Sequence, residues 1–164
     1  MDVTISEYTL DDKPQLVELI DILQDYLADI DPLSRLRRLP GFGEADIEAL
    51  IKRINRQPGA AYIAWSKQKA VGFIAGIIDD QTSGDLLSEI PSRSGRILEL
   101  VVREESRRFG IGTLLIRKIE DFFIENRCDI VRVEVFEPNT AAREFYKHEE
   151  YHDRVIDMVK PLTL

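Results

Sequence analysis

The chain has 164 residues, of which 44% are hydrophobic and 32% are charged, a composition typical of a soluble globular domain with a sizeable core. Thirty acidic residues against 22 lysines and arginines give a net charge of −8, which disfavours nucleic acid and anionic membranes and favours cationic partners. A single cysteine excludes an internal disulfide, and no apolar run reaches the length of a membrane span. We therefore expect one cytoplasmic domain over residues 1–164.

Hydrophobic periodicity predicts a strand and two helices in the first third of the chain. Apolar and polar residues alternate over 3–8, as in a half-buried strand. Apolar residues spaced three and four apart then predict a helix from about residue 12 to 30. A turn at 40–43 breaks this pattern, and apolar residues between 47 and 54 mark a second helix.

The middle of the chain predicts a hairpin, a long loop and a strand. Residues 61–65 and 70–78 form two apolar runs joined by a polar turn at 66–69. Residues 79–95 contain glycine, proline and several serines, so we expect an irregular connection there, of a length that is usually functional or mobile. An apolar strand is expected at 97–102.

The last third predicts a helix at 110–125, a strand at 130–136, a short helix at 139–148 and a strand at 151–159. The complete order is then β-α-α-β-β-β-α-β-α-β. Strand–helix–strand units around a mixed sheet are typical of an α/β or α+β sandwich, and no linker divides the chain.

The most informative segment is Arg107-Arg108-Phe109-Gly110-Ile111-Gly112, which follows a buried strand and opens a helix. Its glycines allow tight turns and a close approach of a ligand to the backbone. Backbone amides at a helix N-terminus favour anions such as a pyrophosphate, and Arg103, Arg107 and Arg108 add local positive charge. The segment is not a Walker loop, and Leu115 stands where a dinucleotide fingerprint requires glycine.

With this strand, loop and helix, the chain resembles the GNAT superfamily of N-acetyltransferases, whose acetyl-CoA motif is Gln/Arg-x-x-Gly-x-Gly/Ala. A second family motif is matched by the strand at 131–136, Asn139 and the pair Phe145-Tyr146. The resemblance implies a GNAT fold, with a mixed, mostly antiparallel sheet flanked by helices. One departure is Glu149-Glu150, where the family usually has glycine and glycine would support a left-handed helix end.

The resemblance implies that acetyl-CoA is the co-substrate and that its pantetheine arm lies along residues 100–102. The residues expected to bind it are Leu100, Val101, Val102, Arg107, Arg108, Phe109, Gly110, Ile111, Gly112, Thr113 and Asn139. A backbone amide near Leu100 would face the thioester oxygen. Tyr146 is implied as the acid that protonates the leaving thiolate, and simple packing is its alternative role.

Glu99 interrupts an otherwise apolar strand next to the implied acetyl site. A charge there needs a reason, because burying an unpaired carboxylate is costly. Glu99 could deprotonate or hold the incoming ammonium, and pairing with Arg96 or Arg132 is the structural alternative.

The resulting hypothesis is an N-acetyltransferase that moves the acetyl group of acetyl-CoA to a primary amine of a small molecule in a ternary complex. The alternatives are a catalytically silent acyl-CoA sensor of the same fold and an interaction domain without CoA. No metal is expected, because His148 and His152 lack metal-like partners. Nucleic acid and membrane are not expected partners, and a homodimer is left open.

Overall fold

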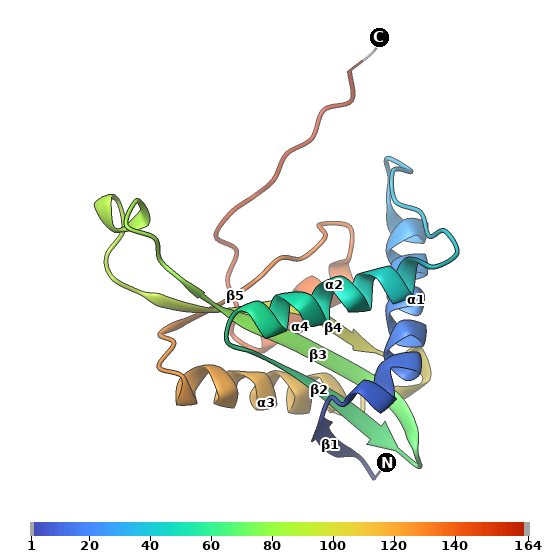
Figure 1. Cartoon of the computed structure of the whole chain (residues 1–164). Helices are drawn as coiled ribbons and strands as arrows, with labels where there is room; N and C mark the ends of the chain where they lie inside the picture. Colours follow the sequence, from blue (N-terminus) through green and yellow to red (C-terminus); the bar gives the residue numbers. More distant parts are fainter. Residues whose placement is uncertain (1, 163–164) are drawn as a thin grey trace. The chain divides into compact units, whose positions relative to one another are not determined.

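The computed structural model describes residues 2–162, and the chain forms two compact units, Met1–Glu134 and Val135–Leu164. The prediction of one domain over the whole chain stays a prediction. The first unit is built on one five-stranded sheet in the order β1-β2-β3-β4-β5 (Figure 1). Its strands are β1 (Thr4–Glu7), β2 (Gly59–Ser66), β3 (Lys69–Asp80), β4 (Arg93–Val102) and β5 (Ile130–Val133). Neighbouring strands are antiparallel except β4 and β5, which confirms the mixed, mostly antiparallel sheet.

Three helices cover the two faces of this sheet (Figure 1). They are α1 (Lys13–Ile30), α2 (Phe42–Arg56) and α3 (Ile111–Glu125). The buried side chains of α1 and α2 share a core with Phe73 and Ala75 of β3. Successive strand residues point to opposite faces, so Gly72 and Gly76 belong to the other face, and α3 packs on them.

Glycine is required where α3 approaches the sheet closely. A Cβ on Gly95 would lie 2.4 Å from the Phe123 ring, and one on Gly76 would lie 2.7 Å from it. Both distances are far below a normal contact. The absence of side chains on β3 and β4 at these positions therefore makes room for Phe123 in the core.

The hairpin between β2 and β3 forms where the sequence predicts it. Ser66 pairs with Lys69 across a two-residue turn, in which Lys67 and Gln68 have φ of 47° and 66°. Two left-handed residues are the signature of a turn whose twist matches that of the flanking strands. The loop after β3 is shorter than expected, spanning 81–92 rather than 79–95, because β3 and β4 continue their ladder out to Asp80 and Arg93.

The second unit contains α4 (Thr140–His148). The Asn139 side chain accepts a hydrogen bond from the Ala142 amide at 3.1 Å and so caps the helix, as its position in the sequence indicates. The strand expected at 151–159 is wrong, because no residue there joins a ladder with any described strand. Its apolar side chains, including Val155 and Met158, are exposed. Alternation shows only that a segment could lie on a sheet, and pairing with another strand decides whether it does.

The helix end at Glu150 has the geometry that glycine would support. Glu150 has φ of 67°, its amide donates to the Lys147 carbonyl at 3.1 Å, and the Tyr151 amide donates to the Tyr146 carbonyl at 2.9 Å. The rings of Tyr146 and Tyr151 pack edge to face, with centroids 5.4 Å apart. This is the Schellman pattern with its apolar contact, formed at a strain of roughly 1 kcal/mol for a non-glycine residue.

Candidate active site

Strand β4 is bulged at Leu98. Ala75 of β3 pairs with Glu99 and the next residue, Gly76, pairs with Ile97, so Leu98 is an extra residue in β4. A bulge bends its strand and re-aims neighbouring side chains. On the other side of β4, the ladder with β5 covers only Ser94–Ile97. Beyond the bulge, the outer edge of residues 98–102 has no ladder partner among the described strands.

The loop between β4 and α3 turns sharply at two positions. Arg108 and Gly110 have φ of 65° and 75°, and Gly110 is the residue that precedes the first turn of α3. Turns of this kind direct successive amides into concave anion sites, and the helix N-terminus adds partial positive charge. A Cβ on Gly110 would meet nothing within 4 Å, so there is open space beside the backbone. The loop therefore fits a phosphate-bearing ligand.

Not every side chain of the predicted CoA-binding set is available to a ligand. Val101 and Ile111 are buried in the core, so only their backbone groups could take part. Phe109 is 58% exposed. The Arg107 Nε donates to the Val102 carbonyl at 3.2 Å, and its guanidinium lies 5.5 Å from the ring centroid of Tyr26.

Arg103 does not add free positive charge to the loop before α3, contrary to the sequence-based expectation. Its side chain is buried, with Nε donating to the Ala70 carbonyl at 2.7 Å and Nη2 lying 2.8 Å from the Glu18 carboxylate. These bonds connect β4 to β3 and α1, because Glu18 belongs to α1. The positive charge of Arg103 is therefore already paired with the carboxylate of Glu18.

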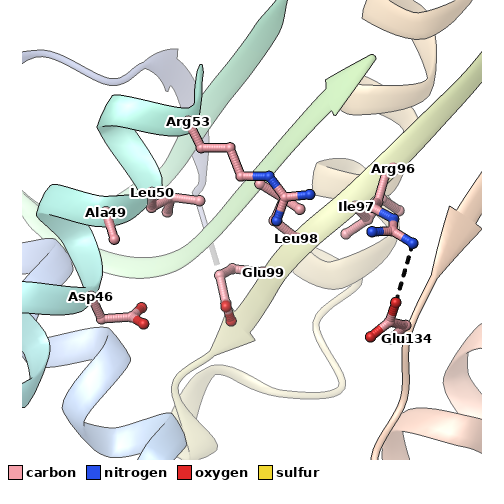
Figure 2. Close-up of a pocket in the computed structure, with 9 residues that line it drawn as sticks. All are labelled: Asp46, Ala49, Leu50, Arg53, Arg96, Ile97, Leu98, Glu99 and Glu134. Atoms are coloured by element: carbon pink, nitrogen blue, oxygen red, sulfur yellow. Dashed lines mark ion pairs between the residues drawn. The ribbon is translucent and has the colours of Figure 1, made fainter. Parts of the chain in front are cut away.

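Glu99 lines a pocket of about 270 Å³ between α2 and β4 (Figure 2). Its carboxyl group and that of Asp46 point into the same space, Asp46 from α2 and Glu99 from β4. The lining residues are Asp46, Ala49, Leu50, Arg53, Arg96, Ile97, Leu98, Glu99 and Glu134.

Burial raises the pKa of Glu99 from 4.5 to about 7, and the negative charge of Asp46 contributes to the same shift. Burial also raises the pKa of Asp46. Across residues 2–162 Glu99 takes part in no ion pair. Arg96 instead lies 3.4 Å from the Asp79 carboxylate and 3.2 Å from that of Glu134. A carboxylate with a pKa near neutrality can accept and release a proton at physiological pH.

Asp46 and Arg53 were not among the site residues that the sequence predicted. They occupy positions i and i+7 of α2 and therefore lie on the same side of the helix as Ala49 and Leu50. The signal in the sequence that could have pointed to them is their spacing, which places both charges on one face of α2 with Ala49 and Leu50 between them. That face could not be assigned to a site without knowing which strand it covers.

Tyr146 of the second unit is buried, and its ring packs edge to face on Phe145 with centroids 5.4 Å apart. The acid role of Tyr146 and the CoA contact of Asn139 stay predictions.

Within residues 2–162 no group of histidine, cysteine and acidic side chains is arranged to hold a metal ion. No helix in the same range has the length and apolar character needed to cross a membrane.

Comparison with known proteins identifies the family. Residues 18–149 match the profile of the acetyltransferase (GNAT) family. An uncharacterized N-acetyltransferase of Methanocaldococcus jannaschii is 33% identical over 91 residues, which cover 55% of this chain and 58% of that protein. The match thus spans little more than half the length of this curated relative.

Solved structures share the fold over nearly the whole chain. A mutant protein from Bacillus halodurans has a TM-score of 0.85 at 18% identity, covering 98% of this chain and 99% of that one. An aminoglycoside acetyltransferase from an uncultured soil sample has a TM-score of 0.68 at 22% identity, covering 98% and 97%. With the family profile matched over most of its length, the chain belongs to the acetyltransferase (GNAT) family.

Proposed function

We propose that the protein is an acetyl-CoA-dependent N-acetyltransferase that acetylates a primary amine of a small molecule by direct attack in a ternary complex. The observation that carries this proposal is Glu99, a half-buried carboxylate whose pKa of about 7 suits a base, set in a pocket beside the unpaired edge of β4. Membership of the family supports the acyl-transfer chemistry.

Acetyl-CoA supplies the acetyl group as an activated thioester. Backbone amides of residues 107–113 would hold its pyrophosphate, since the loop turns at Arg108 and Gly110 and has open space at Gly110. Residues 100–102 offer an unpaired strand edge, to which an amide-containing arm could add as a further strand would. These two features meet at the start of α3, because only the short loop 103–110 separates them.

Glu99 would remove a proton from the acceptor ammonium, directly or through one water, so that the nitrogen lone pair can attack the thioester carbon. A carbon–nitrogen bond forms and the carbon–sulfur bond breaks. A backbone amide near Leu100 would stabilise the negative charge that develops on the carbonyl oxygen. Tyr146 would donate its phenolic proton to the departing sulfur, since an ordinary tyrosine titrates near ~10 and a thiol near ~8.5. After the attack the nitrogen is positively charged, and it gives up its second proton through water to the Tyr146 phenolate. Glu99 releases its proton to bulk water, so both residues return to their starting states.

The feature that would favour a silent acyl-CoA sensor is Glu149-Glu150, which stands in place of the family's usual glycine. The left-handed Glu150 and the hydrogen bonds around it end α4 as glycine would. No other feature of the described residues favours a loss of activity, so we retain the enzyme as the proposed function.

Amine-dependent thiol release from acetyl-CoA tests the proposal directly. The protein should release free thiol only when a suitable amine is present, and mass spectrometry should find the N-acetylated amine. Omission of the amine is the control for simple thioester hydrolysis. Calorimetric binding of acetyl-CoA without turnover of any amine across a broad panel would support the sensor instead.

A further inference from the structure

We propose that the acceptor is dipolar: a terminal primary amine, held between Asp46 and Glu99, joined by a short apolar chain to a carboxylate that Arg53 binds. This inference rests on the proposed function and assigns a substrate class to the same pocket. It follows from the order of charges along the two walls of the pocket (Figure 2).

The helical wall has an acidic end, an apolar middle and a basic end. Asp46, Ala49, Leu50 and Arg53 line the pocket at positions i, i+3, i+4 and i+7 of α2. A helix rises 1.5 Å per residue, so the two charged positions lie about 10 Å apart along the axis. Figure 2 shows the Arg53 side chain reaching from α2 toward Leu98 of β4.

The strand wall repeats this order. Glu99 lies at the acidic end, Leu98 and Ile97 follow, and Arg96 lies at the other end. Because Leu98 is the extra residue of the bulge, Glu99 and Arg96 pair with Ala75 and Ile77, which are two residues apart on β3 and so about 7 Å apart along the strand. The two walls therefore share an acidic end, and both arginines lie toward the other end, where Glu134 also lines the pocket.

The two arginines differ in whether their guanidinium groups already have ion-pair partners. Arg96 is held by Asp79 and Glu134, at 3.4 and 3.2 Å. Arg53 makes no ion pair and no side-chain hydrogen bond within residues 2–162, and it is exposed at the pocket rim. Arg53 is thus available for a ligand anion, and an arginine can bind a carboxylate with two parallel hydrogen bonds.

The acidic end is suited to an ammonium group. Asp46 and Glu99 repel one another, as the contribution of Asp46 to the raised pKa of Glu99 shows. A cation between them would relieve this repulsion. A diamine would place its second positive charge beside Arg53, whereas an amino carboxylate satisfies both ends.

Two acceptors of equal chain length test this inference. 6-Aminohexanoate and cadaverine both present a primary amine on five methylene groups and differ in the distal charge. Wild-type protein should use 6-aminohexanoate with a kcat/KM at least about tenfold higher, a difference of about 1.4 kcal/mol. Arg53→Gln should abolish this preference, and Arg53→Glu should invert it. Arg117→Gln, which removes an exposed arginine of α3 outside the pocket, should leave the preference unchanged.

Calorimetric titration of the same two compounds separates a failure of this inference from a failure of the proposed function. If no amine is turned over, tighter binding of 6-aminohexanoate that depends on Arg53 would still support the dipolar pocket while the enzyme proposal fails. If amines are acetylated but cadaverine is used equally well or better, the inference is overturned while the enzyme stands. A preference that survives Arg53→Glu in a folded variant also overturns it.

Discussion

Replacing Glu99 with glutamine should change stability in a way that depends on pH. The pKa of Glu99 is about 7 in the folded protein, against 4.5 as its ordinary value. The folded state therefore keeps this proton over a range in which the unfolded chain loses it. The associated stability is fully present below about pH 4.5 and is lost as pH rises through about 7.

The size of this effect follows from the two pKa values. The interval from 4.5 to about 7 corresponds to roughly 3 kcal/mol of unfolding free energy, because one pKa unit is worth about 1.4 kcal/mol. Glutamine resembles the protonated carboxyl group and does not ionise. Glu99→Gln should therefore be about as stable as wild type near pH 4.5 and more stable by up to about 3 kcal/mol at pH 8.

Urea unfolding at several pH values between 4.5 and 8 measures this difference. Glu125→Gln is the matched control, because Glu125 is an exposed glutamate at the end of α3 and its replacement should give no such trend. A difference between Glu99→Gln and wild type that stays constant with pH would refute the argument that burial and Asp46 raise this pKa.

The same variant tests the catalytic role. Wild-type kcat/KM should rise with pH through about 7 as Glu99 loses its proton. In Glu99→Gln this rise should disappear, with activity recovering only near the pKa of the free amine, about 10. Between pH 7 and 9 the loss should be about 10²-fold or more, the scale for a positioned base. Full activity across this range would make Glu99 structural.

Three further changes test other parts of the proposal. Gly110→Val should weaken acetyl-CoA binding at least about tenfold, because valine is strained at a φ of 75° and would occupy the open space there; unchanged calorimetric affinity in a folded variant would remove the loop from the site. Tyr146→Phe should lower kcat about 10²-fold with little effect on acetyl-CoA affinity, and the loss should shrink for a thioester of a more acidic thiol; equal turnover would exclude tyrosine as the acid. Glu150→Gly should raise the free energy of unfolding by about 0.5–1 kcal/mol in urea titrations, because glycine removes the strain of the left-handed helix end; a less stable variant would contradict that geometry.

Local features of this protein were predictable from the sequence. The spacing of apolar residues located α1, α2, α3 and the β2–β3 hairpin, and the polar cap at Asn139 marked the start of α4. The turn at Gly110 was also predictable, because a short glycine-bearing loop between a buried strand and a helix leaves few backbone solutions. In each case neighbouring residues determine the outcome, so no distant contact had to be known.

Tertiary structure decided the rest. The extra residue at Leu98 depends on how β4 pairs with β3, and the burial of Arg103 depends on where Glu18 of α1 lies. The pocket joins Asp46 of α2 to Glu99 of β4, and no local pattern relates those two positions. Periodicity determines which residues share a face of one element, whereas packing determines which faces meet. The raised pKa of Glu99 and the charges that line its pocket both depend on which faces meet.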